Sequence, residues 1–294
     1  MKLRRILLFG GTGRLGSAVR KAAGDNVTVA LTAPDRGEVD LLTVTDADLA
    51  ACIGSGLYDV VLNCAAEALV DRCEVERGAA TRINAVVPGM LAEACTRAEV
   101  PFVHTSTDYV FGGPAAPEGP FAESDAIGPA QFYGETKAAG ETAVLSTVGR
   151  RTVARVSWLF GPDAAPFADY VLAQARDRGE VPVLDQASRP TWLPGLARWF
   201  VDLCSALSDG AFTPHILHPA GGPAATRVEW ARAILDANGL RDTPVVPQEA
   251  TETPLAPRPR DTRLDAARTD SWCRATWISG LLDWRDALRD SPEE

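Results

Sequence analysis

The fold is decided by the stretch Arg5-Ile6-Leu7-Leu8-Phe9-Gly10-Gly11-Thr12-Gly13-Arg14-Leu15-Gly16, close to the amino terminus. Its apolar run predicts a buried strand, and a helical pattern follows the glycines. Glycines 10, 13 and 16 fit G-x-x-G-x-x-G, and 11, 13 and 16 fit G-x-G-x-x-G. Glycine permits a tight turn and close backbone approach to a pyrophosphate, and the helix amino terminus adds free N–H groups. The stretch therefore predicts dinucleotide binding.

Strand and helix signals alternate through the first half of the chain. The predicted strands are Ile6–Phe9, Val27–Leu31, Val60–Asn63, Phe102–Thr105 and Thr152–Val156. The predicted helices are Leu15–Ala23, Asp46–Cys52 with Asp46 as N-cap, Cys73–Arg97 and Tyr133–Thr147. This βαβ alternation predicts an α/β fold with a Rossmann-type doubly wound parallel sheet.

The sequence pattern changes after Trp158, where prolines become frequent and strand and helix signals alternate less regularly. The predicted helices there are Leu196–Leu207, Val228–Asn238 and Trp277–Arg289, and Thr253–Arg260 is expected to be extended. We expect residues 1–157 to form a dinucleotide-binding domain. Residues 158–294 should form a smaller, mostly helical lobe that mainly binds substrate, with some strands returning to the main sheet.

Composition narrows the class of protein. The 294 residues are 46% hydrophobic and 23% charged, as in globular proteins, and the net charge is −10. An acidic chain is a poor partner for nucleic acid, and no apolar stretch approaches the roughly 20 residues that span a bilayer. The six cysteines form no C-x-x-C pair and have no histidines at metal spacing. We expect a cytoplasmic protein with reduced cysteines, no metal and no membrane partner.

Tyr133-Gly-Glu-Thr-Lys137 places a phenol and an ammonium four residues apart. On a helix the two side chains share one face. A nearby positive charge favours the charged form of an acid, so Lys137 is expected to lower the pKa of Tyr133. The pair suits proton transfer near neutral pH.

A second polar group follows the strand Phe102–Thr105, in Ser106-Thr107-Asp108. Ligands of doubly wound sheets bind beyond the carboxyl ends of the strands, so these side chains should face the site. The long segment from Phe111 to Gln131 is rich in glycine and proline, and we expect it to form part of a substrate cleft.

Together these landmarks resemble an extended short-chain dehydrogenase/reductase, and within it the dTDP-4-dehydrorhamnose reductase family. They cover almost the whole chain in family order. Besides the stretches quoted above, they are Val61-Leu62-Asn63-Cys64-Ala65-Ala66, Asp71-Arg72-Cys73-Glu74, Ile83-Asn84-Ala85, Tyr109-Val110-Phe111, Arg155-Val156-Ser157-Trp158, Arg189-Pro190-Thr191-Trp192 and Arg258-Pro259-Arg260-Asp261.

The resemblance implies a role for each catalytic residue. Tyr133 would donate a proton to a carbonyl oxygen, and Thr107 would hydrogen-bond the same oxygen. Lys137 would hold the nicotinamide ribose and depress the pKa of Tyr133. The cofactor would also contact Gly10, Gly13, Arg14, Leu15, Gly16, Asp40, Leu41, Ala65 and Ala66.

The substrate side and the assembly follow from the same resemblance. Asp108, Trp158, Arg189 and Trp192 match positions that contact the nucleotide sugar in the family. Glu67-Ala68-Leu69 departs from the family's polar stretch, which leaves the exact sugar open. Ala18 stands where some members carry a glutamate for a magnesium-bridged dimer, so neither metal nor that dimer is carried over; a homodimer is a possible assembly.

Cofactor preference depends on the end of the second strand. NAD-binding folds place an acid there for the ribose 2′-OH, whereas Ala30-Leu31-Thr32 contains none. Arg14 and Arg36 are available for a 2′-phosphate. This favours NADPH, and Asp35 and Asp40 keep NADH open.

Three functions compete at this point. The first is NADPH-dependent reduction of the C4 ketone of a dTDP-4-keto-6-deoxyhexose, in deoxysugar biosynthesis. The second is a non-catalytic, NADP-binding regulatory subunit resembling that of methionine adenosyltransferase, which the intact Thr107, Tyr133 and Lys137 weaken. The third is a reductase of a non-sugar ketone. Product stereochemistry stays open in all three.

Overall fold

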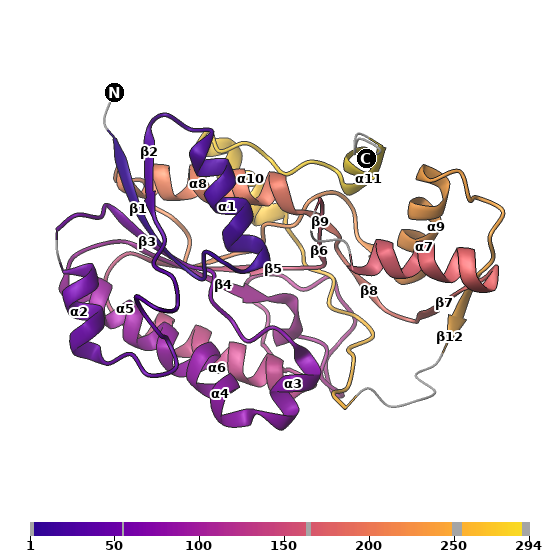
Figure 1. Ribbon diagram of the computed structural model, residues 1–294, viewed down its shortest axis with the longest axis horizontal. Helices are drawn as coiled ribbons and strands as arrows, with labels where there is room; N and C mark the ends of the chain where they lie inside the picture. The colour runs from indigo at the N-terminus through magenta and orange to yellow at the C-terminus, as the bar shows by residue number, and fades with distance from the viewer. Residues whose placement is uncertain (1–2, 55, 163–165, 249–254, 290–294) are drawn as a thin grey trace.

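A six-stranded, all-parallel sheet forms the centre of the computed structural model, which describes residues 3–54, 56–162, 166–248 and 255–289 (Figure 1). The strand order is β10-β5-β4-β3-β1-β2. The bounds are β1 Arg4–Phe9, β2 Val29–Thr32, β3 Val60–Asn63, β4 Phe102–Thr107, β5 Arg151–Val156 and β10 Ile216–Leu217. The order reverses between β1 and β3, which is where doubly wound sheets bind ligands. The predicted Rossmann-type fold is confirmed.

Helices cover both faces of the sheet, which is why its inner strands are continuous apolar runs. On one face lie α1 (Arg14–Gly24) and α8 (Leu193–Ser208); on the other lie α2 (Asp46–Ile53), α5 (Val87–Arg97) and α6 (Phe132–Ser146) (Figure 1). Side chains alternate between the two cores: Ile6 and Leu8 pack toward α8, and Leu7 and Phe9 pack toward α5. This packing fixes the carboxyl ends of the strands as one rigid edge.

The predicted helix Cys73–Arg97 is wrong as a single element. The chain forms α3 (Val70–Val75), α4 (Arg77–Thr81), a π-helical turn (Arg82–Val86) and then α5. Pro88 has no N–H for the carbonyl of Asn84 four residues back, so the α-helical register cannot pass through it. The Val87 N–H reaches back five residues, to Arg82, and absorbs the mismatch.

Smaller corrections concern element ends. Thr45, not Asp46, is the N-cap of α2, because its side chain accepts from the Asp48 N–H in a capping box. The second strand begins at Val29, since Val27 is 93% exposed. The predicted helix Trp277–Arg289 is helical only in α11 (Trp284–Arg289), after an irregular stretch. A helix that the sequence pattern did not predict, α10 (Ala267–Ala275), comes before it.

The second half supplies both a lobe and part of the sheet. The lobe consists of α7 (Pro166–Arg178), α9 (Arg227–Ala237), α11 and the parallel pair β7 (Val181–Leu184) and β12 (Val245–Gln248), around its own core (Figure 1). Meanwhile α8 and β10 return to the sheet, as does α10 through Cys273. The predicted extended segment Thr253–Arg260 lies partly outside the described residues. In the described part of the chain no helix is long and apolar enough to cross a bilayer.

The segment from Phe111 to Gln131 does not form a cleft wall. Phe111 stacks on Phe121 at 4.5 Å between ring centroids, and Gly119 N–H donates to Asp261 Oδ2 at 2.8 Å. Arg263 Nη2 donates back to the Gly119 carbonyl at 2.9 Å. The segment thus packs on residues 261–264, and our cleft expectation for it is wrong.

Candidate active site

Two cavities meet along the carboxyl edge of the sheet. One, of about 340 Å³, is lined by Thr107, Tyr133 and Lys137 among others. The other, of about 370 Å³, runs over the glycine loop toward the end of β2. They share Gly13, Cys64 and Ala66, so they form one continuous groove. The three predicted catalytic residues are therefore brought together at one end of a groove that begins over the predicted dinucleotide loop.

Lys137 lies at the bottom of this groove, one helical turn after Tyr133 on α6. It is 1% exposed, and its Nζ donates to the Thr105 carbonyl at 2.7 Å. Burial lowers the pKa of Lys137 to about 8, and the nearby Glu141 opposes that change. A lysine pKa this close to neutral pH is unusual.

Tyr133 is partly exposed at the groove, edge-on to Tyr109 with 6.1 Å between ring centroids. Burial raises the pKa of the Tyr133 phenol, and a hydrogen bond with Thr107 offsets this only in part. The neighbouring Asp108 raises it further. The expected lowering of the Tyr133 pKa by Lys137 is therefore wrong for the protein alone, because burial is the largest cause of the shift and Lys137 is not among the groups that change this pKa. The phenol keeps its proton at neutral pH, as a proton donor must.

Asp108 is buried, and its carboxylate is occupied by hydrogen bonds from the side chains of Thr107, Ser188 and Thr262. It is 3% exposed, and its carboxylate accepts from Ser188 Oγ at 2.7 Å and Thr262 Oγ1 at 2.6 Å. Thr107 Oγ1 donates to its other oxygen at 3.1 Å. Burial still raises the pKa of Asp108. The carboxylate thus fixes the hydroxyl of Thr107, although it also lines the groove.

The glycine loop leaves a cradle whose shape fits a pyrophosphate. Gly10 has φ +81°, and a Cβ there would lie 2.5 Å from Ala65 N. A Cβ on Gly16 would lie 2.1 Å from Gly10 O, so these two glycines bring loop, helix and β3 into contact. Gly13 differs, because its Cβ would meet only Gly10 O, at 3.4 Å, and its open side belongs to the groove. It is also the N-cap of α1, whose first N–H groups have no side-chain cap.

Most predicted cofactor residues line this groove. Arg14 and Leu15 face the catalytic end, while Arg36, Asp40 and Leu41 lie at the far end, with Ala65 and Ala66 on β3's side. Arg36 Nε lies 3.4 Å from Asp40 Oδ1, and the Arg36 side chain is 74% exposed. The Asp35 carboxylate instead accepts from the Gly37 and Glu38 N–H groups of its own turn. At this end the Arg36 guanidinium is exposed but paired with Asp40, and the Asp35 carboxylate is occupied by its own turn.

The predicted substrate contacts divide. Trp158 lines the catalytic cavity at φ +36°, stacked on Trp230 at 5.3 Å and under the Arg227 guanidinium at 3.8 Å. Arg189 and Trp192 line neither cavity. Burial lowers the pKa of Arg189, which is offset by Asp270 and Asp265, and Trp192 packs on Phe160.

Several residues of the groove were not predicted from the sequence. Ala68, Val70, Tyr109, Val156, Ser157 and Leu159 also line the catalytic cavity. Asn84, in the π-helical turn, bonds both backbone groups of Glu67 at 2.9 and 3.0 Å and donates to Thr136 Oγ1 at 3.1 Å. The sequence signal for this role was the position of Asn84 in the family motif Ile83-Asn84-Ala85. A buried asparagine needs partners for all its polar atoms, so such a residue is expected to hold neighbouring segments together.

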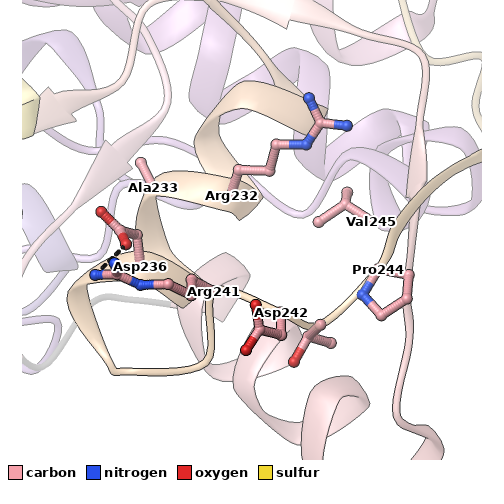
Figure 2. Close-up of a pocket in the computed structure, with 8 residues that line it drawn as sticks. Arg232, Ala233, Asp236, Arg241, Asp242, Pro244 and Val245 are labelled. Carbon is pink, nitrogen blue, oxygen red and sulfur yellow. Dashed lines mark ion pairs between the residues drawn. The ribbon is translucent and has the colours of Figure 1, made fainter.

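Another hollow, of about 540 Å³, lies between α9 and β12 (Figure 2). Its polar lining includes Asp236 and Arg241, which pair at 2.9 Å, with Arg232 and Asp242 directed toward the hollow's rim (Figure 2). It sits at the outer end of the lobe, far from α1 (Figure 1). Its size does not make it the active site, because the glycine cradle and the shifted pKa values of Asp108, Tyr133 and Lys137 belong to the groove.

Similarity to known proteins agrees with this geometry. The profile of the family described as "RmlD substrate binding domain" matches residues 4–294. The chain belongs to this family. It is 35% identical to a dTDP-4-dehydrorhamnose reductase of Mycolicibacterium smegmatis, over 98% of this chain and 85% of that protein. It is also 35% identical to a probable dTDP-4,6-dihydroxy-2-methyloxan-3-one 4-ketoreductase of Streptomyces antibioticus, over 98% and 94%. The crystal structure of dTDP-4-dehydrorhamnose reductase from Bacillus anthracis in complex with NADP superposes with a TM-score of 0.83, at 24% identity and 99% coverage of each chain.

Proposed function

We propose that this family member is an NADPH-dependent ketoreductase that reduces the C4 ketone of a dTDP-4-keto-6-deoxyhexose in deoxysugar biosynthesis. The observation that carries the proposal is the convergence of Thr107, Tyr133 and Lys137 at one end of a groove that starts over the glycine cradle. Relatives at 35% identity over nearly the whole chain carry 4-keto-sugar reductase names.

The residues divide the chemistry. Bound NADPH supplies the hydride. The Tyr133 phenol, protonated at neutral pH, donates its proton to the ketone oxygen. The Thr107 hydroxyl has one proton, which it donates to Asp108 in the ligand-free protein, and it stabilises charge on the ketone oxygen once that O–H turns from Asp108 to the substrate. Lys137 holds the nicotinamide ribose with the N–H groups that Thr105 does not use. This is acid catalysis beside an oriented donor pair.

Cofactor choice follows from the far end of the groove. A 2′-phosphate needs a cation, and Arg36 is exposed there with Arg14 nearer the pyrophosphate. The Asp35 carboxylate, which could accept a ribose 2′-OH, is occupied by its own turn. These contacts support NADPH over NADH.

We extend the proposal to organisation and location. Residues 1–157 bind the cofactor, and 158–294 mainly bind substrate, with Trp158 and Asp108 at the substrate end; Arg189 and Trp192 could contact a nucleotide sugar only beyond the groove. None of the six cysteines, all of which lie in the described residues, is joined in a disulfide, which fits a reducing compartment such as the cytoplasm.

A panel of dTDP-4-keto-6-deoxy sugars, assayed by loss of NADPH absorbance, tests the function. We expect turnover of at least one sugar, competition by dTDP and almost none with Tyr133→Phe. Turnover that dTDP does not inhibit would favour a non-sugar ketone. Tight NADPH binding with no ketone reduced, together with co-purification of an adenosyltransferase, would favour the regulatory subunit.

A further inference from the structure

A chain of buried polar groups runs from the end of β3 to Lys137. It begins at Asn63, which is fully buried and whose Oδ1 accepts from the Ala65 N–H at 3.0 Å. A backbone N–H can only donate, so this bond fixes which end of the Asn63 amide points where. The amide nitrogen, Nδ2, is thereby directed at Nδ1 of His104, 3.1 Å away.

The orientation of Asn63 in turn determines the protonation of His104. This ring is also fully buried, and Asn63 Nδ2 is a donor, so His104 Nδ1 must accept. A neutral imidazole with a bare Nδ1 carries its proton on Nε2. The alternative tautomer, and the imidazolium, would set an N–H against the N–H of Asn63. Burial and Lys137 both lower the pKa of His104, in agreement with a neutral ring.

The other ring nitrogen faces the catalytic lysine. His104 Nε2 lies 3.4 Å from Lys137 Nζ, and Nζ also donates to the Thr105 carbonyl at 2.7 Å. With the proton on Nε2, an ammonium would present a second donor to the same contact. The lone pair of a neutral amine would accept a hydrogen bond from the His104 Nε2–H, and an N–H of the same amine would still donate to the Thr105 carbonyl.

We propose that His104 is a positioning residue for Lys137: with its tautomer fixed by Asn63, it directs an N–H at the lysine nitrogen, so that the neutral amine and the ammonium are both accessible in the working protein. His104 touches neither substrate nor cofactor in this account. The consequence for turnover rests on the proposed reductase function, whereas the consequence for Lys137 itself does not.

Other groups around Lys137 do not supply this effect. From α6 it faces Tyr133 and Glu141, and the Glu141 carboxylate is taken up by Arg155 of β5 at 2.7 Å. Cys64, at the end of β3, is buried with a raised thiol pKa and is uncharged at neutral pH. Glu141 favours the ammonium, and Cys64 would do so only as a thiolate. Among the described neighbours, His104 is the group whose N–H favours the amine.

The chain's composition allows a direct test on the ligand-free protein. It contains three lysines, Lys2, Lys21 and Lys137, so an NMR titration of the lysine side chains has few signals to assign. We expect Lys137 to titrate near pH 8. In His104→Leu, which keeps the site buried but removes the N–H, it should titrate about one pH unit higher, as the loss of one hydrogen bond predicts. His104→Gln can accept from Asn63 and still offer an N–H, so it should restore the wild-type value, and the exposed His215→Leu serves as the matched control.

The histidines provide a second readout that needs no variant. There are only three, and ¹⁵N shifts should show His104 neutral with its proton on Nε2. In Asn63→Asp, whose carboxylate accepts a proton-bearing Nδ1, the proton should move to Nδ1. An Nδ1 proton in the wild type, or a Lys137 titration unchanged in His104→Leu, would overturn the proposal. If the protein reduces 4-keto sugars, the alkaline limb of its kcat–pH profile should shift in His104→Leu by the same amount as the Lys137 pKa. If it reduces none, the Lys137 and histidine titrations still test the proposal.

Discussion

Replacing Lys137 by methionine is expected to stabilise the ligand-free protein at pH 7, although it removes a residue that the proposed reaction needs. Lys137 is 1% exposed, and burial lowers its pKa from 10.5 to about 8. At neutral pH its charge therefore sits in a site that disfavours it. Methionine has a similar length and carries no charge.

The size of the effect follows from the pKa. A lowering of about 2.5 units corresponds to roughly 3 kcal/mol between the charged and neutral forms. The variant also loses the hydrogen bond from Nζ to the Thr105 carbonyl, which lowers its free energy of unfolding by about 1 kcal/mol. We expect the free energy of unfolding to rise by about 2 kcal/mol in Lys137→Met.

The gain should depend on pH in one direction. Between pH 8 and 10.5 the unfolded lysine still holds its proton while the folded one has lost it, so the unfolded state binds more protons. Raising the pH through this window stabilises the folded wild type, and below pH 8 the penalty is complete. The advantage of Lys137→Met should therefore be full at pH 7 and should have reversed by about pH 10.5, where the charge penalty is nearly gone and the loss of the Thr105 hydrogen bond, about 1 kcal/mol, remains.

Urea unfolding of the ligand-free proteins at both pH values measures this. The exposed Lys21→Met is the matched control for loss of a lysine. A Lys137→Met protein less stable than the wild type at pH 7, or an advantage independent of pH, would refute the reasoning.

Three further predictions concern the groove. Tyr133→Phe should lower kcat by about 10²–10⁴-fold with little change in NADPH affinity, measured by initial rates and cofactor titration; wild-type turnover would exclude Tyr133 as the acid. Gly13→Val should fold yet lose NADPH binding by calorimetry, because its side chain enters the groove, whereas Gly16→Val should disturb the fold, since its Cβ would lie 2.1 Å from Gly10 O. Combined Arg14→Ala and Arg36→Ala should weaken NADPH far more than NADH in the same titration; equal losses would contradict the 2′-phosphate assignment.

Much of the framework could be predicted because it depends on local pattern. The apolar run before Gly10 and the spacing of Tyr133 and Lys137 each report a single element and its orientation. The failure at the predicted helix Cys73–Arg97 is also local. The break before α5 comes from one missing N–H at Pro88, and apolar periodicity does not register a lost hydrogen bond.

The roles of site residues were harder to predict where residues distant in the sequence determine the surroundings of a side chain. The motif gave Asp108 as a substrate contact, and only the fold shows that Ser188 and Thr262 enclose its carboxylate. The pKa of Tyr133 was expected to fall because sequence shows the nearby charge but not the burial. Arg189 illustrates the same limit, since its electrostatic partners come from α10 and its connection, more than 70 residues later in the chain.

The junction at Asp108 has a consequence for recombining this protein with its relatives. One carboxylate joins Thr107 to Ser188 and Thr262, so the reacting end of β4 is tied to hydroxyls encoded 80 and 154 residues downstream. A chimaera that imports another member's second half to change sugar preference therefore inherits, or loses, the alignment of Thr107 as well. Any such chimaera must therefore keep Ser188 and Thr262 together with the amino-terminal half that carries Thr107 and Asp108.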